Sequence, residues 1–321
     1  MFCAIPHDQI ISLFSNFNGQ AQSQPDAIVD YFGVSTPILC APYLSDRVGQ
    51  VIESPPFPDD SIRASFVEYL ALTESIQKAN ADRYIMMELG ASYAPFAVLA
   101  ATLARRLGIA DIRLCAVEAA RNAVNAITSN FEANNLNAKH IHIIDDWDQI
   151  KALTAENCNT NAPGVQAYVV NGAYSSNAQT IWFPDVDCTI DNGGKVADDK
   201  LDVDCRGMVC DHFPVKAFTF DQLLGLFPAD SIIDLAHIDI QGAELTVVPD
   251  SISHFNQRVK RVMLGTHSRL IEGEMIKTFH RNGWILIAEE PCGFNYNQSL
   301  GDIVGMTTKD GSQYWVNSRF A

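Results

Sequence analysis

Short apolar runs alternate with segments of helical periodicity through most of this 321-residue chain. The run YIMMELG at 84–90 is apolar apart from Glu88 and closed by glycine, which is typical of a parallel strand buried on both faces. A helix is expected over 96–107, with Pro95 in its first turn and Gly108 just past its end, followed by a strand over 112–117. Further strands are expected over 140–144, 166–170, 232–240, 259–264, 284–288 and 314–316. This alternation predicts an α/β fold with a doubly wound, mostly parallel sheet.

The first 60 residues differ from the rest of the chain. They are rich in turn-forming residues and end in ESPPFPDD, whose three prolines interrupt regular elements. From 61 to 81, apolar residues recur at spacings of three and four, which predicts a helix that leads into the alternating region. We therefore expect an N-terminal extension over 1–60, which covers the substrate or mediates dimers, and one domain over 61–321.

Composition places the chain among folded proteins and argues against a nucleic-acid partner. Hydrophobic residues make up 47% and charged residues 19%, close to ordinary globular usage. The 22 basic and 38 acidic residues sum to −16 at pH 7, a charge that would repel a phosphate backbone. No apolar run approaches the ~18 residues of a membrane span, and the start MFCAIPHDQI lacks the segments of a secretion signal. These features predict a cytoplasmic protein without a membrane span.

Two regions carry possible metal ligands in unsuitable spacings. The eight cysteines include no CxxC pair, and buried, reduced thiols are the expected state in the cytosol. Cys188, Cys205, Cys210 and His212 could bind zinc, although their spacings match no paired-ligand pattern. The aspartate-rich segment 184–211 could bind calcium, yet DVDCTIDNGG departs from the EF-hand spacing. We expect a solvated loop there and assign no metal site to these residues.

The turn after the first predicted strand, in MELGASYAPF, has the character of a cofactor-binding turn. Its small residues Gly90, Ala91 and Ser92 lead into a helix, so the backbone can approach a ligand at the carboxyl end of a parallel strand. Glu118 ends the second predicted strand, where an acidic side chain can accept hydrogen bonds from ribose hydroxyls. Glu88 suits the ammonium and sulfonium charges of S-adenosylmethionine better than a pyrophosphate. The pattern indicates an adenosine-containing cofactor; the alternatives are a ligand-free tight turn and a surface glutamate.

A second group of polar residues follows the strand predicted over 232–240, in LAHIDIQGAEL. Asp239 lies near the carboxyl end of that strand, and Gln241 and Glu244 follow in the turn and the next helix. A carboxylate at this edge of the sheet can act as a general base or align an acceptor hydroxyl with a methyl group. The alternative is that Asp239 only caps the following helix.

His267, in VMLGTHSRLIEGEM, also follows a predicted strand on the ligand side of the sheet. A histidine titrates near neutral pH and could remove a proton from an alcohol. Asp239, Glu244 and His267 could instead bind a divalent metal that lowers the pKa of a bound hydroxyl, and the sequence leaves this choice open. His237, inside the strand, is interpreted as a satisfied core histidine.

Several segments together resemble the FkbM-type S-adenosylmethionine-dependent methyltransferases. In chain order these are ELGASYAPF, VEAARNAVNAITSNFEANN, HIDIQGAEL, LGTHSRLIEGEM, NGW and the closing TTKDGSQYWVNSRF. The resemblance covers 61–321, and HIDIQGAEL combined with GTHSR is its most specific part. It implies a Rossmann-like class I methyltransferase fold with a seven-stranded sheet. It also implies O-methylation of a hydroxyl of a sugar, polyketide or similar small-molecule acceptor, with S-adenosyl-L-methionine as cofactor.

The same resemblance assigns roles by position. Asn171 and Gly172, in NGAYSSNAQTIWFP, would contact adenine, and Asp145 or Asp146 is a rival for that contact. The ribose would be bound by Glu118. The methionine part of the cofactor would be contacted by Glu88, Gly90 and Ser92. The residues that would face the substrate are Asp239, Gln241, Glu244 and His267.

Ser92 and Ala94 depart from the family pattern, which usually has glycines at these positions. A non-catalytic, cofactor-binding member of the same fold is therefore one alternative. A nicotinamide-dependent oxidoreductase is the other, and Tyr93 and Pro95 would restrict the room its pyrophosphate needs. The sequence determines neither the acceptor nor the metal dependence, and a homo-oligomer remains open.

Overall fold

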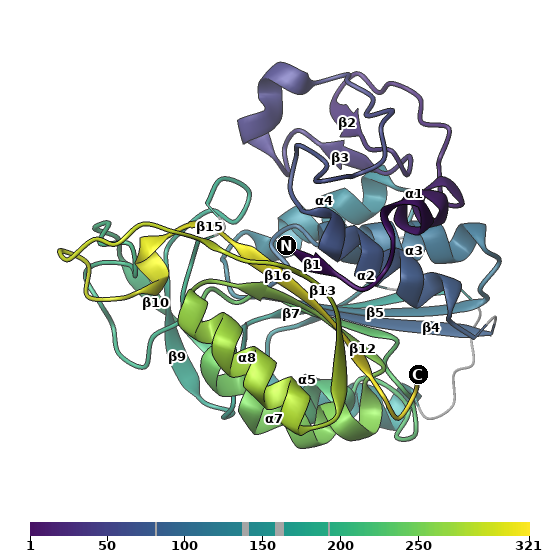
Figure 1. Ribbon diagram of the computed structural model, residues 1–321. Helices are drawn as coiled ribbons and strands as arrows, with labels where there is room; N and C mark the ends of the chain where they lie inside the picture. Colours follow the sequence, from purple (N-terminus) through teal and green to yellow (C-terminus); the bar gives the residue numbers. More distant parts are fainter. Residues whose placement is uncertain (81, 137–140, 158–163, 192) are drawn as a thin grey trace.

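A nine-stranded sheet forms the centre of the molecule in the computed structural model, which describes residues 1–80, 82–136, 141–157, 164–191 and 193–321 (Figure 1). The strand order is β1-β13-β16-β12-β11-β4-β5-β7-β6. Every neighbouring pair from β12 to β6 is parallel, whereas β16 is antiparallel to both β12 and β13. The strands are β1 (Phe2–Cys3), β4 (Arg83–Leu89), β5 (Asp111–Glu118), β6 (Ile141–Ile144), β7 (Gly164–Asn171), β11 (Leu235–Ile238), β12 (Arg261–Thr266), β13 (Trp284–Glu290) and β16 (Gly311–Asn317).

This architecture confirms the predicted α/β fold, a Rossmann-like, doubly wound and mostly parallel sheet. The sheet has two strands more than the seven that the resemblance implied, and β1 is the one that the sequence pattern did not place. β1 adds to one edge by pairing antiparallel with β13, and β6 forms the other edge beside β7. Part of the strand expected over 140–144 lies outside the described residues, and β6 begins at Ile141.

Helices cover both faces of the sheet (Figure 1). On one face, residues of α2, α3 and α4 share a buried apolar cluster with the sheet, and α1 packs against α2. On the other face, residues of α5, α6, α7 and α8 belong to a second buried cluster. The helices are α1 (His7–Ser15), α2 (Phe66–Gln77), α3 (Pro95–Arg106), α4 (Ala123–Ala133), α5 (Trp147–Asn157), α6 (Phe220–Leu224), α7 (Glu244–Arg258) and α8 (Arg269–Arg281). None of the helices in the described ranges is long and apolar enough to cross a membrane.

The first helix of the main domain begins later than its periodicity predicted. α2 starts after Ser65, whose side chain accepts from Val67 N, while Glu68 accepts from Ser65 N to complete a capping box. The preceding residues 62–64 form a turn because the Asp60 carboxylate accepts hydrogen bonds from their three backbone N–H groups. Apolar spacing cannot distinguish that turn from helix, so the helix expected from 61 is shorter at its start.

The strand order reverses beside β4, and this reversal determines where a ligand can bind. From β4 the chain proceeds through β5 toward β6 and β7, and then returns to build β11 and β12 on the opposite side. In such sheets the connections leave β4 and its neighbour in opposite directions, which opens a crevice beyond their carboxyl ends. Leu89 pairs with Ile238 of β11 on one side and with Val117 of β5 on the other. The turns after β4, β5 and β11 therefore meet at one place.

The N-terminal 60 residues pack against the main sheet and its helices. Besides β1 and α1, they contain a hairpin of β2 (Ala27–Val29) and β3 (Ser35–Pro37), which packs against α4. A 3₁₀ helix, η1 (Pro42–Arg47), follows. Whether 1–60 acts as a separate extension stays a prediction.

Three smaller strands and the aspartate-rich segment lie beside the main sheet. β8 (Ala173–Tyr174), β10 (His212–Phe218) and β9 (Thr180–Pro184) form a three-stranded sheet. Between β9 and β10, Arg206 pairs with Asp191 at 2.7 Å and with Asp204 at 2.6 Å. Two short strands, β14 (Gly293–Phe294) and β15 (Thr307–Lys309), pair near the end of the chain, and the 3₁₀ helix η3 (Val304–Met306) precedes β15.

Candidate active site

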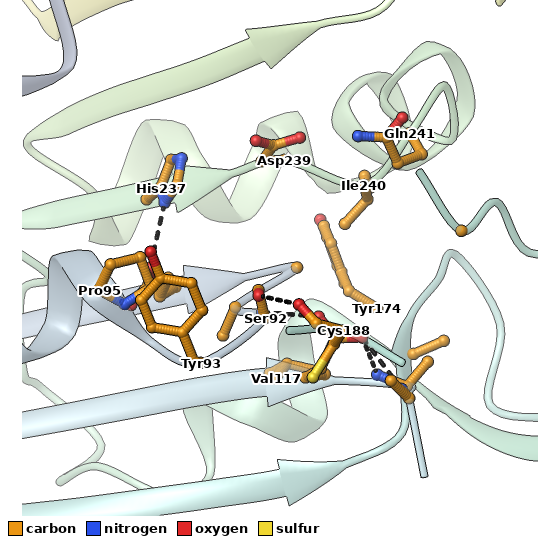
Figure 2. Close-up of a pocket in the computed structure, with 18 of the residues that line it drawn as sticks. Ser92, Tyr93, Pro95, Val117, Tyr174, Cys188, His237, Asp239, Ile240 and Gln241 are labelled. Carbon is orange, nitrogen blue, oxygen red and sulfur yellow. Dashed lines mark hydrogen bonds and ion pairs between the residues drawn. The ribbon is translucent and has the colours of Figure 1, made fainter. Parts of the chain in front are cut away.

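A cavity of about 260 Å³ lies at the carboxyl ends of β4, β5 and β11. In Figure 2, His237, Asp239 and Gln241 follow one another along one side of it, and Ser92 and Val117 lie on the other. Of the predicted site residues, those that line the cavity are Glu88, Gly90, Ala91, Ser92, Glu118, Gly172, Asp239 and Gln241. The structure thus brings most of the predicted cofactor-binding residues and two of the predicted substrate-facing residues to one cavity.

Segments outside the sheet complete the cavity wall. Tyr43 comes from the N-terminal 60 residues, and Arg63 comes from the turn that precedes α2. Cys188 and Asp191 come from the aspartate-rich segment. Arg63 lies 3.3 Å from an Asp30 oxygen and 3.4 Å from an Asp60 oxygen, so its position is fixed by two ion pairs. Nothing in the local sequence pattern identified these residues, because loops have no periodicity that says which way a side chain points.

The turn after β4 has the positive φ angles of a glycine-rich turn, although only one of the three residues concerned is glycine. Gly90 has φ +84°, and the two following departures from the family pattern, Ser92 and Ala94, have φ of 49° and 55°. Side chains other than glycine adopt this left-handed conformation at a cost of about 1–2 kcal/mol each. The turn therefore keeps the conformation that glycines would favour at the two positions where the chain lacks them.

Glu118 holds this turn in place. Its Oε2 accepts a hydrogen bond from Ser92 N at 2.7 Å, and its Oε1 accepts from Ala119 N at 2.8 Å and Ala120 N at 3.0 Å. Burial raises the pKa of the Glu118 carboxyl above its usual value, and the three N–H groups oppose that shift. The Ser92 hydroxyl donates to Cys188 O at 2.8 Å, which ties the turn to the aspartate-rich segment.

Glu88 is buried beneath the same turn. Its carboxylate accepts from Phe96 N at 3.2 Å and Ala97 N at 2.7 Å, two N–H groups in the first turn of α3. A carboxylate at a helix N-terminus is stabilised by these donors and by the helix dipole. Glu88 therefore joins the cavity wall to the first turn of α3.

Of the two residues expected to contact adenine, one lines the cavity and the other does not. Gly172 lines the cavity and donates its backbone N–H to Glu118 O at 2.9 Å. Asn171, at the end of β7, is not among the lining residues. The rivals Asp145 and Asp146 also lie outside the lining, and Asp146 pairs with Lys216 of β10.

Asp239, His267 and Glu244 form a linear arrangement next to the cavity. His267 Nε2 lies 3.1 Å from Asp239 Oδ1, and His267 Nδ1 lies 3.0 Å from Glu244 Oε1. Parallel pairing of β11 with β12 brings these residues together, because both strands end at the same edge of the sheet. Glu244 is held in turn by Ile240 N at 2.9 Å and Gly242 N at 2.8 Å.

This arrangement does not favour His267 as the neutral base that the sequence suggested. Burial alone would lower the pKa of His267, but Glu244 and Asp239 outweigh it and hold that pKa well above its ordinary value. Burial would raise the pKa of Asp239, and His267 reverses this and lowers it. Both shifts favour a protonated His267 beside an ionised Asp239.

His237 was missed, and its interpretation as a satisfied core histidine is wrong. It is 2% exposed and lines the cavity, yet neither ring nitrogen makes a hydrogen bond to any described residue. Its Nδ1 lies 3.8 Å from Glu88 Oε1, too far for a hydrogen bond. Two positions before Asp239 on an extended segment, it shares that residue's face of the sheet, so strand periodicity could have identified it.

The chain is similar in sequence to a protein with a given name. No family model matches the chain. A protein from Jannaschia sp. (strain CCS1) named "Putative methyltransferase" is 25% identical over 272 residues, which are 85% of this chain and 87% of that protein.

Solved structures of methyltransferases also match. The precorrin-6y C5,15-methyltransferase from Geobacter metallireducens GS-15 has a TM-score of 0.38 and 11% identity, with 80% of this chain and 88% of that chain covered. The N-terminal domain of human METTL16 in complex with SAH has a TM-score of 0.37 and 12% identity, with 81% and 72% covered.

Proposed function

We propose that this protein is an S-adenosylmethionine-dependent O-methyltransferase of the FkbM type, acting on a hydroxyl of a sugar, polyketide or similar small molecule. One observation carries the proposal: the turn held by Glu118 and the carboxylate of Asp239 face each other across a single cavity. A methyl donor and an acceptor can meet there at the crevice of a doubly wound sheet. The similarity to the Jannaschia protein supports the same reaction class.

The cofactor would lie along the turn after β4. Glu118 would accept hydrogen bonds from the ribose hydroxyls with the lone pairs that its three backbone donors leave free. Glu88, Gly90, Ala91 and Ser92 would surround the methionine part. The adenine would reach the region of Asn171 and Gly172.

The reaction would be a direct displacement. The acceptor oxygen attacks the methyl carbon while the carbon–sulfur bond breaks, its electron pair returns to sulfur, and S-adenosylhomocysteine leaves. Asp239 would orient the hydroxyl and take its proton, His267 would hold Asp239 in place, and Gln241 would contact the acceptor. Alignment of the two reacting atoms supplies most of the rate enhancement that such a displacement needs.

A hydroxylated small molecule suits the part of the cavity wall that contains Asp239. Glu68, Asp239 and Asp310 all line it, and carboxylates are hydrogen-bond acceptors for neutral hydroxyl groups. A net charge of −16 argues against a nucleic-acid acceptor. A cytoplasmic location, and a substrate-covering or dimerising role for 1–60, belong to the same proposal.

Isothermal titration with S-adenosylhomocysteine tests the cofactor class without knowledge of the acceptor. NAD serves as the competing cofactor in a parallel titration. Stoichiometric binding of S-adenosylhomocysteine alone is expected. Binding of NAD alone would identify the oxidoreductase alternative, and binding of neither would refute a cofactor-dependent enzyme.

The catalytic part is tested by methyl transfer from labelled S-adenosylmethionine to a panel of sugars and polyketides. The Asp239→Asn variant should bind S-adenosylhomocysteine within about twofold of wild type and lose turnover by at least about 100-fold. Asp199→Asn, in the exposed part of the aspartate-rich segment, is the matched control and should behave as wild type. Normal turnover by Asp239→Asn would refute the assigned role. Cofactor binding without transfer to any acceptor would favour the non-catalytic alternative.

A further inference from the structure

We propose that His267 Nε2, Asp239 and Asp310 bind one divalent cation of the Mn²⁺ type at the acceptor end of the cavity. The ligand set differs from the one the sequence left open, because Asp310 takes the place of Glu244. The binding site itself depends only on the geometry of these residues. The use of the cation in catalysis rests on the proposed function.

His267 Nε2 has two carboxylate oxygens near it on the cavity side. His267 Nε2 lies 3.1 Å from Asp239 Oδ1 and 3.9 Å from Asp310 Oδ1. Two ligands at right angles on an octahedral ion with bonds of about 2.1 Å are about 3 Å apart, so the separation of His267 Nε2 from Asp239 Oδ1 fits two ligands of one ion. The Asp310 side chain is 59% exposed and is free to rotate toward such an ion. Asp239 and Asp310 both line the cavity, which gives an ion a route to the site.

Three buried polar atoms of this group make no hydrogen bond within the part of the chain that the structure describes. His267 is 1% exposed, and neither of its ring nitrogens makes a hydrogen bond to a described residue. Asp239 Oδ1 is also buried and makes no hydrogen bond to any residue in the described ranges, although it lies 3.1 Å from Nε2. Close approach without hydrogen-bond geometry is expected for two ligands of one ion. A buried polar group without a hydrogen bond otherwise carries an energetic penalty that calls for an explanation.

Glu244 lies behind the histidine and not beside the ion. Its Oε1 faces His267 Nδ1 at 3.0 Å, on the opposite side of the ring from Asp239. Both of its oxygens already accept backbone N–H groups, from Ile240 and Gly242. A carboxylate that accepts the second N–H of a ligating histidine fixes the tautomer and the ring orientation. With Glu244 3.0 Å from Nδ1, a proton on Nδ1 would be favoured, which would leave the Nε2 lone pair for the ion.

The donor set defines the class of cation. Two carboxylates and one imidazole combine the oxygen ligands preferred by Mg²⁺ and Mn²⁺ with a nitrogen that Mn²⁺ accepts readily. The three ligands leave other octahedral positions for water and for an acceptor oxygen. Bound there, a hydroxyl would become more acidic. Asp239 would hold the ion through Oδ1 and take the hydroxyl proton through Oδ2, after which the acceptor oxygen attacks the methyl group.

Electron paramagnetic resonance of Mn²⁺ tests the site with the metal alone. Titration of the full chain with MnCl₂ should remove one equivalent of the free Mn²⁺ signal, and Mg²⁺ should compete for the site. Pulsed spectra should show nitrogen modulation from His267, lost in His267→Gln. Binding of Mn²⁺ without nitrogen modulation, or without a saturable single site, would overturn the proposal.

Variants separate this site from weak binding to the acidic surface. Asp310→Asn changes an exposed side chain and should weaken Mn²⁺ binding at least tenfold, and Asp239→Asn should weaken it further. Asp198→Asn, an exposed aspartate of the 184–211 segment, is the control and should leave the affinity unchanged. Wild-type affinity in Asp310→Asn and Asp239→Asn would refute the ligand set. Titration of S-adenosylhomocysteine without metal keeps this outcome distinct from failure of the proposed function, and its binding by each variant shows that the variant is folded.

Discussion

A Cβ atom placed on Gly90 would lie 1.7 Å from the backbone oxygen of Asp239, so these two residues are in direct backbone contact. Asp239 N also donates to Leu89 O at 2.8 Å, one residue before Gly90. The turn proposed for the cofactor and the carboxylate proposed for catalysis are therefore built against each other. A change on one side cannot be absorbed without moving the other.

Replacement of Gly90 by alanine should therefore damage both stability and cofactor binding. Gly90 has φ +84°, and the clash is with backbone and not with a flexible side chain. We expect the free energy of unfolding to fall by about 3 kcal/mol or more, with no detectable binding of S-adenosylhomocysteine. Gly108→Ala is the matched control. Gly108 has φ +81° but no atom within 4 Å of the added Cβ, so the loss should be about 1 kcal/mol with normal binding. Equal effects of the two changes in denaturant unfolding and calorimetry would contradict the role of this contact.

Ala94→Gly should stabilise the protein. Ala94 is the N-cap residue of α3 and has φ 55° and ψ 50°, a conformation that glycine adopts without strain. Relief of that strain should exceed the loss of one buried methyl group, for a net gain of about 0.5 kcal/mol in the free energy of unfolding. Ala100→Gly, inside the same helix, removes a methyl group of the same size without strain to relieve. It should destabilise by about 1–2 kcal/mol, and a loss of stability in Ala94→Gly would contradict the argument.

Glu118→Gln should weaken binding of S-adenosylhomocysteine about 10- to 100-fold, or about 1.4–2.7 kcal/mol. A glutamine has one acceptor oxygen, so its amide NH₂ must face either Ser92 N or the N–H groups of Ala119 and Ala120. The turn at Ser92 or the contact to the ribose would be lost. Glu132→Gln, on the exposed side of α4, is the control for a change of one charge. Unchanged affinity of Glu118→Gln in calorimetry would remove Glu118 from the cofactor site.

Glu68 gives the stability of the protein a specific pH dependence. Burial raises the pKa of its carboxyl to about 7. An acid whose pKa is raised on folding takes up a proton as the chain folds, so its contribution is present at low pH and is lost as the pH rises from about 4.5 to 7. Glu68→Gln removes the titration and keeps an oxygen that can accept from Ser65 N. Between pH 5 and pH 8, the free energy of unfolding of the glutamine variant should therefore gain about 2 kcal/mol relative to wild type. Parallel pH profiles of the two proteins in urea unfolding would show that Glu68 is not the titrating group.

Much of the fold followed from local sequence patterns. α3 was placed within one residue at each end, because Pro95 and Gly108 act on the backbone within a single turn. The start of α2 was displaced, because the Asp60 hydrogen bonds that hold residues 62–64 in a turn leave no trace in the apolar spacing. β1 was not foreseen, because its pairing with β13 joins residues nearly 290 positions apart in the sequence.

For the candidate site, sequence patterns predicted which chemical groups lie at the strand ends: Glu88, Glu118, Asp239 and His267. They could do so because the side of a parallel sheet on which a strand ends follows from chain direction. Three features emerge only from the folded chain: His267 lies between two carboxylates, His237 makes no hydrogen bond to a described residue, and Asp310 comes within 3.9 Å of His267. The physical reason is that a side chain's protonation and partners depend on distances of a few ångströms between strands. Packing of the whole chain sets those distances, and no local pattern encodes them.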